Sequence, residues 1–66
     1  SISDEQLLAM VEAGPSVSCR EQAAYAVWLR GLAQSRERLE KVLASSDDPL
    51  VVLAVHMALY YIAHAE

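Results

Sequence analysis

Apolar residues recur along this chain at the three-to-four-residue spacing of helices, and capping residues divide it into three segments. The last segment stands out because residues 50–63 contain only one strongly polar side chain, His56. A helix that is apolar on all sides must be buried on all sides. Since a chain of 66 residues offers little other protein to cover such a helix, the pattern indicates self-association or a stable heterocomplex.

A first helix is expected at residues 4–13. Ser3 and Gln6 have the spacing of a capping box, and the pair Gly14-Pro15 ends the helix. The apolar side of this helix consists of Leu7, Leu8, Met10 and Val11. This stripe is long enough to dock on the rest of the chain but too short to be stable alone, so the helix is predicted to act as a clasp.

A second, long helix is expected at about residues 19–44, opening with a capping box from Ser18 to Glu21. Its seam positions recur at spacings of 3, 4, 3, 4 and 3, a heptad pattern typical of helix-on-helix packing. These positions are Tyr25, Trp28, Leu32, Ser35, Leu39 and Val42. Gly31 lies inside this helix, where glycine costs roughly 1 kcal/mol relative to alanine. It marks a close helix crossing or a bend, or it is simply tolerated.

A third helix is expected at about residues 49–64. Asp48 is its cap, and Pro49 occupies the first helical position, where no backbone N–H is needed. At about 100° per residue, the helix has two apolar faces. One face holds Leu50, Leu53, Met57 and Tyr61, and the other holds Val51, Val55, Leu59 and Ile62. Of the two edges between them, one carries Ala54 and Ala58 and the other carries His56 and Tyr60.

The predicted fold is all-α, with one domain over residues 1–66 in which a short, a long and a medium helix form an antiparallel hairpin with an N-terminal clasp. One face of the third helix packs on the second helix, and the other face is expected to pair with a second copy about a two-fold axis. The interface candidates are Val51, Val55, Leu59, Ile62, Ala54, Ala58, Trp28 and Tyr25. A glutamate at Val55 should then prevent association, because it would bury an unpaired carboxylate. The alternative is a heterocomplex in which a partner's helix or groove covers the same surface.

Charge is unevenly distributed along the chain, whose net charge is −4. All five basic residues lie in the middle segment, and the segments on either side are purely acidic. The basic residues are Arg20, Arg30, Arg36, Arg38 and Lys41. Such an acidic domain without a dense basic stripe is not expected to bind nucleic acid. Arg30, Arg36 and Arg38 form either a docking patch for an acidic partner or a merely solvated helix face.

The expected location is the cytoplasm. The apolar C-terminal run is too short to span a bilayer, which needs about twenty residues, and no signal-peptide pattern opens the chain. Cys19 is the only cysteine, which rules out an internal disulfide and is compatible with a reducing compartment. No membrane association is therefore expected.

Few side chains suggest chemistry. Cys19 lies near the start of the second helix, where the helix dipole can activate a thiol, but a lone cysteine more often acts as a small apolar residue. His56, Tyr60 and His64 line one edge of the third helix. The two histidines are two turns apart, too far for one metal ion on a straight helix, so a hydrogen-bonded interface is favoured. No catalytic residue, cofactor or metal is expected.

These features predict a small non-enzymatic protein that acts by stoichiometric protein–protein binding, as an inhibitor, adaptor or co-chaperone does. The excess of apolar helical surface and the lack of paired catalytic groups motivate this prediction. The alternative is an oligomerisation module or structural subunit of a larger assembly. An enzyme is not expected, because a helical hairpin of this size offers little concave volume for a substrate.

Overall fold

The computed structural model describes residues 2–64, and over this range the chain is all-helical, as expected. It contains α1 (Asp4–Ala13), α2 (Val17–Arg30), the short 3-10 helix η1 (Ala33–Ser35), α3 (Arg36–Ser45) and α4 (Pro49–Ala63). The expected count of three helices is wrong, because the long second helix is divided into α2 and α3. Residues 1, 65 and 66 of the expected domain lie outside the described range.

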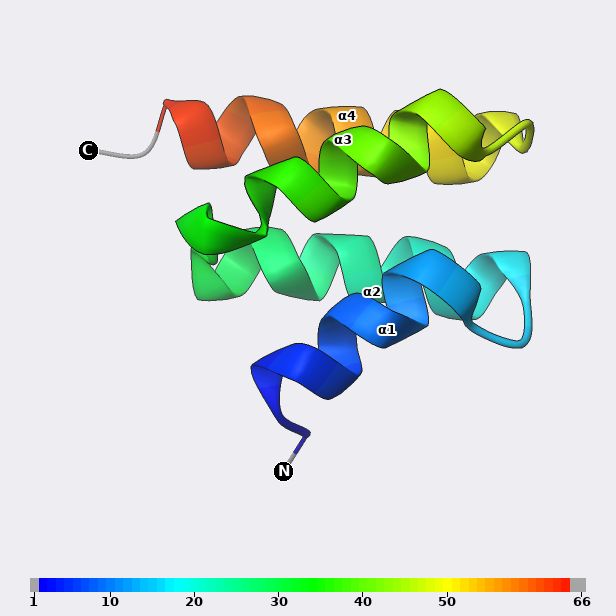
Figure 1. Cartoon of the computed structure of the whole chain (residues 1–66), viewed down its shortest axis with the longest axis horizontal. Coiled ribbons are helices and arrows are strands. Elements are labelled where there is room, and N and C mark those ends of the chain that lie inside the picture. The colour runs from blue at the N-terminus through cyan, green and yellow to red at the C-terminus, as the bar shows by residue number, and fades with distance from the viewer. Residues whose placement is uncertain (1, 65–66) are drawn as a thin grey trace.

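The four α-helices form two antiparallel hairpins, α1 with α2 and α3 with α4 (Figure 1). The most extensive helix–helix contact joins the two hairpins through α2 and α4, and a smaller one joins them through α1 and α3. In Figure 1, α1 and α3 lie toward the viewer, and α2 and α4 lie behind them. The result is a slab of 31 × 26 × 16 Å with one surface made by α1 and α3 and the other by α2 and α4.

The boundaries of α1 agree with the sequence prediction. The Ser3 hydroxyl accepts from the Gln6 backbone N–H at 3.1 Å, and the Gln6 side chain accepts from the Ser3 N–H at 2.9 Å, which completes the capping box. The helix ends at Gly14, whose N–H donates to the Met10 carbonyl. A Cβ at Gly14 would lie 2.6 Å from that carbonyl oxygen, so only glycine allows the chain to turn this closely.

The N-terminus of α2 lies two residues before the predicted one. Ser16, not Ser18, is the cap, because its hydroxyl accepts from the Cys19 N–H at 3.1 Å. The Arg20 Nε then donates to the Val11 carbonyl at 2.9 Å. Because this carbonyl belongs to the last turn of α1, Arg20 supplies from the neighbouring helix the cation that α1 itself lacks at its C-terminal end.

Gly31 ends α2 and breaks the predicted long helix. Its φ of 65° and ψ of 42° place it in the left-handed region, which glycine adopts without steric cost. The Gly31 N–H donates to the Trp28 carbonyl at 2.9 Å, and the Leu32 N–H donates to the Val27 carbonyl at 3.3 Å. These two bonds form a Schellman motif, and the buried Leu32 and Val27 side chains supply its hydrophobic contact.

The heptad spacing continues through this break without requiring a continuous helix. Leu32, Ser35, Leu39 and Val42 are all buried, so the turn keeps the second half of the seam directed into the core. At Leu32 the chain makes an inverse γ-turn, with the Ala33 N–H donating to the Gly31 carbonyl at 2.8 Å. The fully buried Ser35 hydroxyl donates to the Leu32 carbonyl. The polar interruption in the seam therefore satisfies a backbone group of the turn.

The boundaries of α4 also agree with the prediction. The Asp48 Oδ1 accepts from the N–H groups of Leu50 at 3.0 Å and Val51 at 3.5 Å, and Pro49 occupies the first helical position. The helix ends at Ala63.

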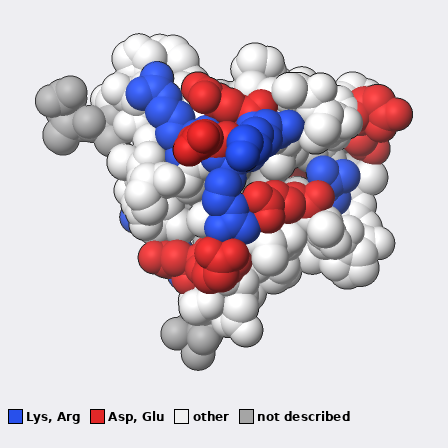
Figure 2. Space-filling view, viewed as in Figure 1, with Lys and Arg blue, Asp and Glu red and all other residues white. Residues whose placement is uncertain are grey.

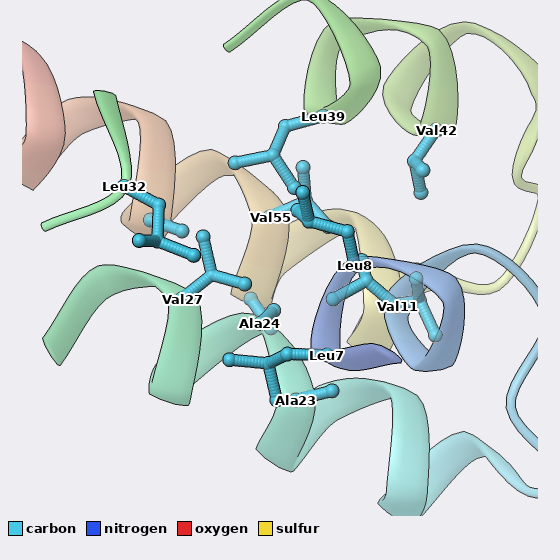
Figure 3. Close-up of a cluster of buried hydrophobic side chains, with 13 residues drawn as sticks. Leu7, Leu8, Val11, Ala23, Ala24, Val27, Leu32, Leu39, Val42 and Val55 are labelled. Carbon is cyan, nitrogen blue, oxygen red and sulfur yellow. The ribbon is translucent and has the colours of Figure 1, made fainter. Parts of the chain in front are cut away.

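One hydrophobic core joins all four helices (Figure 3). Its buried members are Leu7, Leu8, Val11, Ala23, Ala24, Val27, Leu32, Leu39, Val42, Val51, Ala54, Val55 and Ala58. The contributions of α2 and α4 consist only of alanine and valine. Such small side chains allow two helices to approach closely, which explains why the α2–α4 contact is the most extensive in the chain.

The Gly31 turn leads to a test of the division between α2 and α3. We expect Gly31→Ala to lower the free energy of unfolding by about 1 kcal/mol, because a left-handed L-residue costs about 1–2 kcal/mol and the stiffer unfolded chain offsets part of this. Gly31→Asn should lower the free energy of unfolding by less than Gly31→Ala does, because asparagine tolerates the left-handed conformation better than alanine. Urea unfolding of the three proteins measures both differences.

If α2 and α3 were one continuous helix, Gly31→Ala would change the free energy of unfolding in the opposite direction. In a helix interior, glycine is roughly 1 kcal/mol worse than alanine, so Gly31→Ala would then raise the free energy of unfolding. Steric clash cannot account for a loss, because nothing lies within 4 Å of a Cβ built at Gly31. A stabilised alanine variant would show that α2 and α3 are one helix in solution.

Candidate functional site

The two surfaces of the slab differ in charge. Figure 2 shows acidic and basic side chains gathered over the surface made by α1 and α3. In contrast, α4 contains no Asp, Glu, Lys or Arg between Pro49 and Ala63. Helix α2 has Arg20, Glu21 and Arg30, and both of these arginines bond to atoms of the α1 segment. Glu21 is therefore the one charged residue that these two helices leave for their outer surface within the described range.

The outer side of α2 and α4 is therefore an apolar surface, which we call the α2–α4 face. It consists of Tyr25, Trp28 and Leu29 from α2 with Leu50, Leu53, Met57, Tyr60 and Tyr61 from α4. Leu29 is 79% exposed, Tyr60 57% and Leu53 54%. Single exposed apolar residues are ordinary, but a group of this size on two neighbouring helices is the candidate interaction surface of the chain.

Aromatic stacking joins the two helices at this face. The Trp28 and Tyr61 rings stack with centroids 4.3 Å apart and planes 13° from parallel. Tyr25 lies 6.2 Å from Trp28, and Tyr60 meets Tyr61 edge-on at 5.2 Å. These contacts pack the four aromatic side chains against one another across the two helices.

His64 extends the aromatic row at the C-terminal end of α4. Its ring stacks on Tyr60 at 4.2 Å, and its Nδ1 lies 2.7 Å from the Tyr60 carbonyl oxygen. His56 is exposed on the same helix. Of the edge residues expected to act together, the structure brings Tyr60 and His64 into contact. No group of three or more potential metal ligands occurs within residues 2–64.

The predicted interface residues of α4 occupy different places from those expected. Val51, Ala54, Val55 and Ala58 are completely buried inside the single chain, and Leu59 and Ile62 are half-buried against the core. Tyr25 and Trp28 lie half-buried at the α2–α4 face. The outward side of α4 is instead the one with Leu50, Leu53 and Tyr61, which was expected to pack internally.

The physical reason for this exchange is the space between the helices. Both sides of α4 are about equally apolar, so hydropathy does not choose between them. The side that contains alanine and β-branched valine faces inward, because its small, stiff side chains fit where α2 approaches closely. The longer leucine and tyrosine side chains remain outside. Figure 3 shows Val55 in the middle of the core cluster.

Cys19 lies in a groove between α1 and α2 rather than at the α2–α4 face. The groove has a volume of about 440 Å³, and its lining includes Ile2, Leu7, Met10 and Gln22. The thiol is half-buried, three residues into α2, and its backbone N–H is already engaged by the Ser16 cap. No histidine lines this groove, so the structure places no candidate base beside the thiol.

The expected arginine patch is occupied by the chain's own carboxylates. Arg38 on α3 makes a two-pronged contact with Glu12, with its Nε at 2.8 Å and its Nη2 at 2.7 Å from the two carboxylate oxygens. A third donor of Arg38 reaches Glu5 at 2.8 Å. Arg30 on α2 bonds to Asp4 at 2.7 Å and to the Ile2 carbonyl at 2.9 Å. These contacts hold α1 against both α2 and α3.

We call the contacts of Arg30 and Arg38 with the α1 segment the arginine clamp. Its geometry shifts the pKa values of Glu12 and Arg38. The hydrogen bonds and the positive charge of Arg38 hold the pKa of Glu12 below its ordinary value of 4.5, although partial burial acts in the opposite direction. The same contacts with Glu12 and Glu5 raise the pKa of the Arg38 guanidinium, which stays charged at any working pH. Arg36 makes a longer pair with Glu40 at 3.7 Å on the exposed side of α3.

No protein-family model, curated protein or solved structure matches this chain. None of the helices within residues 2–64 has the length and apolar character needed to cross a membrane. The site therefore rests on its own geometry. Sequence reasoning named Trp28 and Tyr25 but missed the outer α4 residues and Leu29 as surface residues. The signal that separates the two sides of α4 is residue size, since alanine and valine alternate with leucine and tyrosine around the helix.

The assignment of inner and outer sides predicts contrasting variants of α4. Val55→Glu should abolish cooperative folding, because a carboxylate in the core costs more than about 3 kcal/mol. Leu53→Glu should change the free energy of unfolding by less than about 1 kcal/mol, because the side chain reaches solvent. Circular dichroism with thermal unfolding measures both. A Val55→Glu protein that folds and unfolds cooperatively would show that Val55 lies at the surface and not in the core.

The Arg38–Glu12 contact predicts a dependence of stability on pH. Since the pKa of Glu12 is lower in the folded chain than in the unfolded chain, the contribution of its ion pair is present above pH 4.5 and is lost progressively as the pH falls below that value. Glu12→Gln should therefore be less stable than the parent at neutral pH and lose less stability on acidification. Urea unfolding from pH 7 to pH 3 gives both curves.

The control for this experiment is Glu37→Gln. Glu37 is exposed on α3 and makes none of the ion pairs found within the described part of the chain. Its substitution removes the same formal charge, and the acid dependence should remain that of the parent. If both variants reduced the acid-induced loss of stability equally, overall charge and not the contact with Arg38 would set the dependence of stability on pH.

Proposed function

We propose that this chain is a small non-enzymatic interaction protein that binds another protein stoichiometrically, in the manner of an inhibitor, adaptor or co-chaperone. The α2–α4 face is its binding surface. The observation that carries the proposal is the separation of the two surfaces of the slab: ionisable side chains gather over α1 and α3, and large apolar side chains are exposed on α2 and α4. A partner that covers the apolar face removes its contact with water, which is the main driving force of association.

The side chains of the face are of the kinds that contribute most to binding. Trp28, Tyr60 and Tyr61 are aromatic, and such residues are enriched among the anchors of protein interfaces. Their mutual stacking keeps them ordered. The exposed fractions of the face correspond to apolar surface on the order of 500 Å², enough for the centre of a specific interface once a rim is added.

The ionisable groups support binding over catalysis. Asp4, Glu5, Glu12, Arg30 and Arg38 are engaged with one another and hold α1 in place. They are not arranged around a cavity in which a substrate could react. The same pairing leaves few free cations for a phosphate backbone, so nucleic acid is not the proposed partner.

An oligomerisation module is the second candidate function. The exposed apolar face supports it as well, since a module that only brings chains together would also use such a surface. The two candidates differ in whether the bound chain is another protein or a copy of this one. A cytoplasmic location belongs to the proposal as well, because the half-buried Cys19 thiol is stable in a reducing compartment.

The proposal predicts that capture of a partner depends on the α2–α4 face. We expect the tagged chain to retain a specific protein from a lysate of its source cells, and Leu53→Glu to reduce the retained amount at least tenfold, which corresponds to about 1.4 kcal/mol. Ala44→Glu is the matched control, because it adds the same charge on the exposed side of α3. Quantitative mass spectrometry compares the three baits.

The captured protein is then purified and titrated into the wild-type chain by calorimetry, where a stoichiometry of one partner site per face is expected. Leu29→Glu provides a second face variant on α2, at the most exposed apolar side chain. Equal capture by the parent and by both face variants would overturn the proposed binding surface. No specific capture by any of the baits would remove the inhibitor or adaptor function.

A further inference from the structure

We infer that in the absence of another protein the α2–α4 face is occupied by a second copy of this chain, in a symmetric two-fold dimer. The inference rests on the proposed function, because it takes the α2–α4 face as the binding surface. In such a dimer the same surface patch is contributed by both chains. The face must therefore be compatible with itself in charge, composition and size.

Charge permits self-pairing on this surface. The chain carries a net charge of −4, so two copies repel each other in general. This repulsion is weakest at the α2–α4 face, because α4 has no Asp, Glu, Lys or Arg between Pro49 and Ala63, and α2 adds only Glu21 to the two arginines that bond to the α1 segment. The surface made by α1 and α3 would instead bring Glu37, Glu40 and Lys41 against their own copies. The apolar face is the side on which two acidic chains can meet at the lowest electrostatic cost.

Composition also favours a second copy over a distinct partner. Interfaces between different proteins that form and separate are about as polar as the rest of the surface, and their charges select the partner. Homodimer interfaces are more apolar. With four aromatic side chains, several aliphatic ones and no charged member, the face has little means of rejecting a wrong partner by charge and matches the homodimer type.

The size of the face determines how strong the dimer is. Surface on the order of 500 Å² from each chain lies at the lower end of specific interfaces, so the dimer should dissociate on dilution through the micromolar range. The whole described chain exposes only 4149 Å², so burial of this face covers a substantial part of the small molecule's surface. A dimer of this strength also leaves the face open to a tighter-binding target.

Trp28 makes the association measurable without a label. It is the single tryptophan of the chain, and it stacks on Tyr61 within the face. Formation of the dimer should remove water from its exposed edge and shift its emission to shorter wavelength. The same signal should move to longer wavelength as the dimer dissociates on dilution.

The test is sedimentation equilibrium of the wild-type chain over a dilution series, with Trp28 emission recorded on the same samples. We expect a mass that rises from one 7.2 kDa chain to two with concentration, and an emission shift that follows the same curve. Leu53→Glu and Leu29→Glu should each weaken the dimer by roughly a hundredfold or more, because the new carboxylate must be buried in the interface. Ala44→Glu, on the opposite surface, should dimerise as the parent does.

Three results would overturn the inference. The first is a monomeric wild-type chain up to millimolar concentration. The second is a dimer that both face variants leave intact, or whose formation does not move the Trp28 emission, because association would then use another surface. The third is a monomer whose Trp28 emission shifts on addition of zwitterionic phosphatidylcholine vesicles, which would identify the face as a lipid-binding surface. Circular dichroism establishes that each variant is folded.

Failure of the inference and failure of the proposed function are separate outcomes. A monomer that still captures a protein through Leu53 and Leu29 overturns the self-dimer and retains the interaction protein. A dimer that dissociates on substitution of these residues but captures nothing retains the self-dimer and identifies the chain as an oligomerisation module.

Discussion

The close packing of α2 against α4 determines most of this structure. It joins the two helical hairpins and gathers alanine and valine at the centre of the core. Because the small side chains are needed inside, the leucine and tyrosine side chains of α4 remain on its outer side. The exposed apolar face is thus a consequence of how the core is packed. A chain with larger residues at Ala54 and Ala58 would separate the hairpins and could not present the same surface.

The clamp of Arg30 and Arg38 places the charged groups on the opposite side of the molecule. Each arginine binds carboxylates of α1 that are distant in sequence, so the purely acidic start of the chain and its basic middle are the two halves of one intramolecular contact. Ion pairs this exposed contribute little stability individually. Their larger effect is on position, since they hold α1 against α2 and α3 and direct these arginines toward the carboxylates of α1.

Local signals in the sequence were sufficient for the starts of α1 and α4, and insufficient for the ends of α2 and for the packing of the helices. Ser3 with Gln6, and Asp48 with Pro49, act through neighbouring backbone groups, and both predicted helix starts are confirmed. The prediction of one long helix was wrong because a heptad pattern indicates only which residues face the core. The Gly31 turn keeps these residues directed into the core although the helix is interrupted. The sides of α4 were not distinguishable by hydropathy alone. The choice between Val55 and Leu53 for the core depends on the space left by α2, which is a property of the whole fold.

The turn at Gly31 also governs how two chains could exchange parts. It connects the α1–α2 hairpin to the α3–α4 hairpin, and within residues 2–64 it is the covalent link between them. If this turn straightened into helix, as the uninterrupted heptad spacing would allow, the hairpins of one chain would move apart and each could complete its core with the complementary hairpin of another chain. Domain swapping of this kind would conserve the contacts between the helices and change those made by the turn, including the burial of Leu32. The left-handed glycine favours the bent form over the straight one, and so works against such an exchange.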